Sequence, residues 1–80
     1  MIVLPPNKDG NTMLHFAASG SNFGLLRGVI GDGYDINAKN NKGESPLRIA
    51  SKFGRHENIA ELLKRGANPN ERDNAGNPPI

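Results

Sequence analysis

The sequence predicts an all-α repeat protein, a solenoid of helix-turn-helix units joined by β-hairpin loops. Three observations support this fold class. The chain aligns with itself without insertions when it is shifted so that Gly10 falls on Gly43 and Gly43 falls on Gly76. Each aligned unit contains two segments in which apolar residues recur at helical spacing. A turn rich in Gly, Asn, Lys and Asp follows the second segment of each unit.

The repeat is clearest at positions where local structure makes strict demands. Besides the three glycines, identical matches include Leu14 with Leu47, Ala17 with Ala50, Gly33 with Gly66, and Asn37 with Asn70. This register predicts a single domain over residues 1–80. Its expected parts are an N-terminal strap at 1–6, repeat 1 at 7–39, repeat 2 at 40–72 and a partial third repeat at 73–80. A disordered tail is an equal alternative for the strap.

The first helix of each unit has a clear start signal. Thr12 and Ser45 are expected N-cap residues, because a hydroxyl oxygen can accept a hydrogen bond from an otherwise unpaired N–H group of the first turn. Pro46 then occupies the first helical position, where its fixed φ is favourable. The predicted first helices span 13–19 and 46–53.

The second helices are predicted at 22–32 and 55–65, with Gly33 and Gly66 ending them in a left-handed conformation. The first of these helices contains three glycines, at positions 24, 28 and 31. Each interior glycine costs about 0.5–1 kcal/mol relative to alanine. We therefore expect this helix to be short, bent or mobile.

The two units resemble the ankyrin repeat. The first reads Gly-Asn-Thr-Met-Leu-His-Phe-Ala-Ala over 10–18 and Gly-Tyr-Asp-Ile-Asn over 33–37. The second reads Gly-Glu-Ser-Pro-Leu-Arg-Ile-Ala-Ser over 43–51 and Gly-Ala-Asn-Pro-Asn over 66–70. The resemblance implies that His15 braces neighbouring repeats through hydrogen bonds. Arg48 replaces this histidine in the second unit, so the next junction is expected to be looser.

Composition gives no support for catalysis, a cofactor or a metal site. The chain has no Cys and only two histidines, His15 and His56, which lie on different predicted helices. Neither histidine has a nucleophile or a paired acid placed to work with it. The acids fall mostly at turns or on the outward helix faces, where Glu57 and Glu61 are assigned. We predict that the protein is not an enzyme.

The strongest functional signal is the placement of charge. The stretch from Lys39 to Arg55 carries a net charge of +4, against +2 for the whole chain. In the ankyrin pattern, hairpin tips and the free face of the first helix line one concave side. Phe53 falls at a solvent-facing position beside these bases, although an arrangement in which it folds onto its own unit remains open. The predicted partner-binding residues are Lys39, Asn41, Lys42, Glu44, Lys52, Phe53, Arg72 and Asn74, flanked by Asn11, Ser19 and Asn77.

Two functions remain in competition. The resemblance implies a scaffold that binds another protein, and the basic residues favour a partner with an acidic surface. The alternative is nucleic-acid or other polyanion binding through the strip between Lys39 and Arg55, which the modest net charge disfavours. No apolar run is long enough to span a membrane, and the missing Cys suits an intracellular, cytoplasmic protein. Two helix pairs without an evident cap indicate either a piece of a longer array or self-association.

Overall fold

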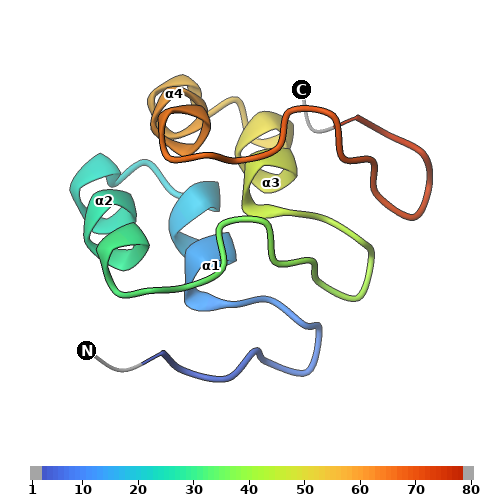
Figure 1. Cartoon of the computed structure of the whole chain (residues 1–80), viewed down its shortest axis with the longest axis horizontal. Helices are drawn as coiled ribbons and strands as arrows, with labels where there is room; N and C mark the ends of the chain where they lie inside the picture. Colours follow the sequence, from blue (N-terminus) through green and yellow to red (C-terminus); the bar gives the residue numbers. More distant parts are fainter. Residues whose placement is uncertain (1–2, 79–80) are drawn as a thin grey trace.

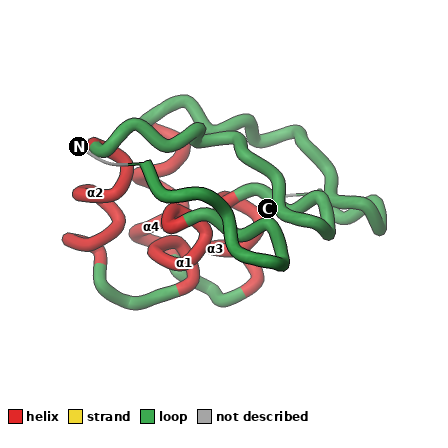
Figure 2. Tube along the Cα trace, turned by 90° about the horizontal axis from the view of Figure 1, so that it is seen from below, coloured by secondary structure: helices red, strands yellow, loops and turns green. Residues whose placement is uncertain are grey.

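Two helix pairs lie side by side in the computed structural model, which describes residues 3–78 (Figure 1). The first pair is α1 (Met13–Ser19) with α2 (Phe23–Gly31), and the second is α3 (Pro46–Lys52) with α4 (His56–Lys64). Helix α1 packs against α3, and α2 packs against α4. The hairpin loops gather on one side of the helices, short connections within each helix pair lie on the opposite side, and the described residues contain no strand (Figure 2). The expected hairpin loops are therefore built from turns and not from strand ladders.

The turns repeat in the register that the sequence predicts. In the three successive hairpins, the amides of Gly10, Gly43 and Gly76 donate to the carbonyls of Asn7, Asn40 and Asp73, at 2.9, 2.9 and 3.0 Å. We call α1 and α3, the first helices of the two repeats, the inner helices, and α2 and α4 the outer helices. The inner helices begin at equivalent positions of their repeats, and so do the outer helices. The predicted all-α repeat fold is confirmed.

The helix starts follow the N-cap chemistry that the sequence predicts. The Thr12 hydroxyl accepts from the backbone N–H of His15 at 3.4 Å, and the Ser45 hydroxyl accepts from that of Arg48 at 3.2 Å. Pro46 is the first residue of α3. Helix α1 has the predicted bounds, whereas α3 ends one residue earlier than expected because Phe53 is its C-cap.

The outer helices are one residue shorter at each end than predicted, because the expected terminal residues serve as caps. Gly33 and Gly66 follow these helices with φ of +96° and +98°, so the left-handed endings are confirmed. The first outer helix was predicted to be short, bent or mobile; it is not shorter than its counterpart, since α2 and α4 have nine residues each, and a bent or mobile α2 stays a prediction. The side chain of Asn22 caps α2 by accepting from the Leu25 amide at 3.0 Å.

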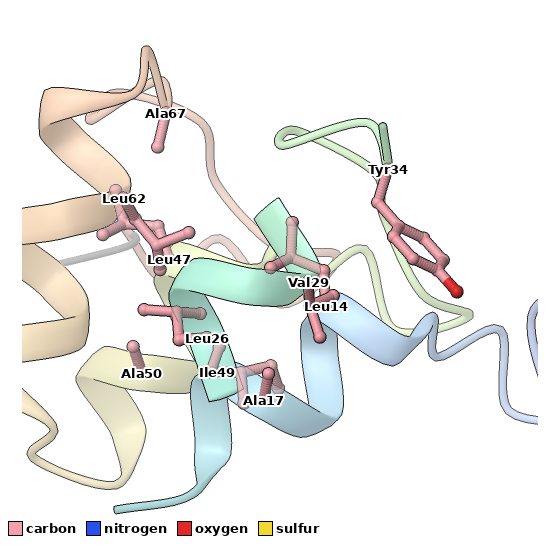
Figure 3. Packing of buried hydrophobic residues seen from close by; sticks show 11 residues of the cluster. Leu14, Ala17, Leu26, Val29, Tyr34, Leu47, Ile49, Ala50, Leu62 and Ala67 are labelled. Carbon is pink, nitrogen blue, oxygen red and sulfur yellow. The ribbon is translucent and has the colours of Figure 1, made fainter. Parts of the chain in front are cut away.

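The core lies between the two helix pairs (Figure 3). Leu14, Leu26, Leu47 and Leu62 contribute one leucine from each helix, and all four are fully shielded from solvent. Burial of each such side chain stabilises the fold by about 1.5–3 kcal/mol. The small residues Ala17, Ala18 and Ala50 are also buried, which allows the inner helices to approach closely.

One charged side chain departs from its expected position, and the N-terminal segment contacts the first repeat. Glu61 is buried, in contrast to the outward position assigned to it, and its carboxylate binds Arg65 at 2.7 Å. In the N-terminal segment, the amide of Leu4 donates to the Tyr34 hydroxyl at 2.9 Å. Residues 1–2 of the proposed strap and 79–80 of the partial third repeat lie outside the described residues.

Candidate functional site

A hollow of about 410 Å³ opens between the hairpin tips and the inner helices α1 and α3. We call it the aromatic hollow, because Phe16 of α1 and Phe53 at the end of α3 both line it. These two rings are 57% and 54% exposed. The hairpin and inner-helix residues that line it include Asp9, Asn11, His15, Ser19, Asn40, Asn41, Lys42, Glu44, Ile49 and Lys52.

Five of the eight predicted partner-binding residues meet at this hollow: Asn41, Lys42, Glu44, Lys52 and Phe53. The exposure of Phe53 favours the open arrangement over the one in which this ring folds onto its own unit. Asn74 lines a second hollow of about 520 Å³, which shares Lys42 and Lys52 with the first. We call this second cavity the basic hollow.

Two predicted contact residues, Lys39 and Arg72, line neither hollow. The ammonium group of Lys39 lies 3.9 Å from the Glu71 carboxylate. The guanidinium of Arg72 donates to the Gly76 carbonyl at 3.0 Å within its own turn. Arg72 is therefore committed to its own hairpin, and Lys39 is directed towards the acid that precedes the third hairpin.

Phe16 is the main residue that the sequence prediction missed. The sequence analysis assigned no role to it, and its repeat counterpart Ile49 is buried. The helical spacing within α1 carried the opposite signal, because Leu14, Ala17 and Ala18 define the buried face and position 16 lies off it. This spacing is the signal that could have placed the ring on the surface.

Glu44 and Lys52 lie where the two hollows meet, and they line both of them, as Asn41 and Lys42 also do. Their side chains meet at 2.8 Å, and the carboxylate also accepts from the Asn40 side-chain amide at 3.0 Å. Burial raises the pKa of Glu44, but the hydrogen bonds from Lys52 and Asn40 outweigh this effect and the net shift is downward. Glu44 is buried, so it supports the floor of the site and does not belong to its rim.

His15 lies beneath the aromatic hollow and joins the two repeats. Its Nδ1 accepts from the Thr12 amide at 3.1 Å. Because that nitrogen is an acceptor, Nε2 carries the proton and donates to the Glu44 carbonyl at 2.7 Å. This is the brace that the resemblance implied. In the second unit, Arg48 lies 3.5 Å from the Asp73 carboxylate of the third hairpin, and the looser junction there stays a prediction.

Most bases of the predicted strip already have polar partners. Lys39, Arg48 and Lys52 each have a carboxylate within 4 Å, and the Arg55 guanidinium donates to the Ser19 carbonyl at 3.0 Å. Within residues 3–78, Lys42 is the one base of the strip without such a contact. The strip is therefore a set of paired groups and not a continuous cationic surface.

Metal sites and membrane spans are both missing from the described part of the chain. Among residues 3–78, no group of three or more His, Asp, Glu or Cys side chains is placed to hold a metal ion. None of the four described helices is long and apolar enough to cross a bilayer.

The fold and the site define a repeat protein with a concave face lined by hairpin tips and inner helices. The family model for ankyrin repeats, described as three copies, matches residues 3–73. This chain belongs to the ankyrin-repeat family, whose members are generally modules for protein–protein interaction.

Relatives share this repeat region. An IkB-like protein of African swine fever virus is 37% identical over 71 residues, which cover 84% of this chain and 30% of the viral protein. Human Rabankyrin-5 is 38% identical over 66 residues, covering 82% of this chain and 6% of the relative. Human neurogenic locus notch homolog protein 4 is 47% identical over 38 residues, or 48% of this chain and 2% of the relative. The chain thus spans only a minor part of the proteins it matches.

Proposed function

We propose that this chain binds another protein through its hairpin tips and the concave face of its inner helices. The observation that carries this proposal is the pair of exposed rings, Phe16 and Phe53, at one hollow. Large aromatic side chains of this kind are costly to leave in water and are common at the centres of protein interfaces. A partner that places an apolar side chain between the rings would bury them both.

The polar groups around the rings suit a protein partner. Asn11 and Asn41 bring polar side chains to the same hollow, and the Asn11 NH2 group and the Asn41 side-chain oxygen can bond a partner backbone. The Asn40 side chain is committed to Asn11, Lys42 and Glu44. Lys42 supplies an ammonium group that is open to an acidic residue. The pairing of the other bases argues against the nucleic-acid alternative, because a polyanion needs several cations that are open at once.

The two acids at this hollow, Glu44 and Asp9, are arranged in a way that suits binding and not catalysis. Glu44 is held by Lys52, and Asp9 lies on an exposed hairpin. A catalytic pair of carboxylates needs a shared cleft that places the two in different environments. The absence of Cys from the sequence suits an intracellular, cytoplasmic setting for this interaction.

The test compares variants of the immobilised chain as bait in a cell extract, with captured proteins identified by mass spectrometry. Phe53→Ala and Phe16→Ala are each expected to weaken capture of a specific partner at least tenfold, which is a usual effect for an interface centre. Lys52→Ala is expected to weaken it as well. Leu25→Ala is the matched control, because Leu25 is an exposed apolar residue on α2 that lines neither hollow.

The measurement that decides is the affinity of the purified partner for each variant, by calorimetry. If both phenylalanine variants bind as tightly as the unchanged chain, the concave face is not the contact surface. Circular dichroism of each variant separates loss of contact from loss of fold.

A further inference from the structure

The basic hollow differs in charge from the aromatic hollow beside it. Lys42, Arg48 and Lys52 face Glu44 and Asp73 across the basic hollow, which leaves a net charge of +1. The aromatic hollow has Lys42 and Lys52 against Asp9 and Glu44, and its net charge is zero. The concave face therefore has a neutral apolar hollow and, next to it, a cationic polar one.

The acid that faces Arg48 is already satisfied by its own turn. The Asp73 carboxylate accepts from the Ala75 amide at 2.9 Å, from the Asn77 amide at 2.8 Å and from the Asn77 side chain at 3.1 Å. These bonds, led by the Asn77 amide, hold the pKa of Asp73 below its usual value. Asp73 is thus a stable anion without Arg48.

Arg48, in contrast, has a carboxylate nearby but forms no hydrogen bond with it. Its Nε lies 3.5 Å from Asp73 and is buried without a hydrogen bond. No hydrogen bond from its side chain occurs among the described residues, and the side chain remains 22% exposed. A guanidinium in this state can bind a second carboxylate through its outer nitrogens, since it has five donors in a planar fork.

The two lysines of the basic hollow differ in whether they are already paired. Lys52 is bound to the buried Glu44, and withdrawing it would leave a buried carboxylate uncompensated, which is costly. Lys42 is exposed and has no ion pair within residues 3–78. The cations that can bind a carboxylate of a partner are therefore Lys42 and Arg48. They lie on either side of Glu44 in the sequence, and both line the basic hollow.

We propose that the partner segment carries an Asp or Glu next to its apolar anchor, and that this carboxylate binds Lys42 and Arg48 in the basic hollow. This inference rests on the proposed function, because the apolar anchor occupies the aromatic hollow. It adds a direction to the contact: the acid of the partner lies on the side of the third hairpin.

The probe is a set of blocked peptides that each hold one leucine and one glutamate separated by one to three glycines, together with glutamine counterparts. They are titrated into the full ¹⁵N-labelled chain, and the backbone amide shifts are followed at low salt. For at least one spacing, the glutamate peptide is expected to bind about three- to fivefold more tightly than its counterpart, as for a partly exposed ion pair. The largest glutamate-dependent shifts are expected at Lys42, Arg48 and Ala75, and the preference shrinks at high salt.

Two variants isolate the cations. Arg48→His removes the fixed charge but restores the residue type of the first unit, so the fold is preserved; the glutamate preference is expected to disappear while leucine-dependent shifts at Phe53 remain. Lys42→Gln is expected to reduce the preference as well. Arg27→Gln is the control, because Arg27 is exposed on α2 and lines neither hollow.

The outcomes separate this inference from the function on which it rests. Loss of leucine-dependent shifts in Phe53→Ala, with the glutamate preference unchanged in Arg48→His and Lys42→Gln, overturns the inference and leaves the proposed function standing. Absence of any peptide-dependent shift around Phe16 and Phe53 overturns both. A short random-sequence RNA that shifts the same amides more strongly than every glutamate peptide would also overturn the acidic protein segment as the ligand.

Discussion

At the scale of single residues, a few donors from the second repeat satisfy the carbonyls that end helix α1. The last carbonyls of a helix have no partner inside it. The Asn58 side chain donates to the carbonyls of Ala17, Ala18 and Gly20, at 3.4, 3.0 and 2.9 Å, and Asn58 is 2% exposed. This buried amide and His15 fix the two repeats relative to each other from opposite sides of the junction.

His15 makes the stability of the junction depend on pH. Burial lowers the pKa of His15 below 6.5, although the hydrogen bond to the Glu44 carbonyl and the nearby Glu44 carboxylate act in the opposite direction. Protonation also removes the lone pair on Nδ1 that accepts from the Thr12 amide. The unfolded chain therefore binds a proton at a higher pH than the folded chain does. Stability is expected to fall as pH drops below about 6.5 and to level off below the folded pKa.

The measurement is the free energy of unfolding in urea between pH 8 and pH 5. His15→Gln is expected to be less stable at pH 8, because the brace is weakened, and to lose most of the pH dependence in this window. His56→Gln serves as the control, since His56 is exposed at the start of α4. An unchanged pH profile in His15→Gln would contradict the assignment.

At the scale of elements, α2 shows how capping and burial offset a poor helix sequence. It has glycine near both ends and at position 28, yet it is as long as α4. The Asn22 cap and the burial of Leu26 and Val29 act against the glycine cost. Prediction from local propensity alone failed here because these tertiary contacts outweigh it.

Substitution of Gly28 is expected to stabilise the protein. A Cβ added at Gly28 meets nothing within 4 Å, and the residue is helical with no positive φ. Gly28→Ala should raise the free energy of unfolding by about 0.5–1 kcal/mol. Gly33→Ala is the opposite case, because Gly33 has φ of +96°, and it should destabilise by about 1–2 kcal/mol. Urea unfolding at neutral pH checks both, and a destabilised Gly28→Ala would show that the glycine serves packing or motion in α2.

At the scale of the whole molecule, the features that recur at the same position of each repeat could be predicted from the sequence. The caps Thr12 and Ser45, the left-handed glycines and the four helices all follow from local chemistry that recurs in each repeat. The exposure of Phe16 and the burial of Glu61 did not follow. Phe16 differs from its buried repeat counterpart Ile49, and Glu61 was expected on the outward helix face. The pairing of the basic strip was also missed, since Lys39–Glu71 and Arg48–Asp73 join residues that only the folded chain brings together.

The two end faces of this stack also determine how copies of the chain can associate. The repeat register places Leu25 where the second unit has Asn58, and Leu25 is 46% exposed on the first unit. It places Asn22 where the second unit has Arg55, and the Asn22 side chain is committed to its own helix. Head-to-tail stacking would therefore bring Leu25 against the end of α3. There the Ala50 and Ser51 carbonyls accept from the Arg55 and Gly54 amides, but the Phe53 carbonyl would lack the donor that Asn58 gives to the equivalent Gly20 carbonyl of the first unit.

We accordingly expect that self-association does not proceed by head-to-tail stacking. Burial of the Phe53 carbonyl without a partner would cost about 1–3 kcal/mol, and an open heterologous contact of this kind would otherwise grow into filaments. Light scattering is expected to give a mass that reaches a limit with rising concentration, whereas Leu25→Asn supplies the missing donor and should promote larger species. A mass that rises steadily for the unchanged chain, and falls in Leu25→Asn, would mean that the apolar end face is itself sufficient for stacking.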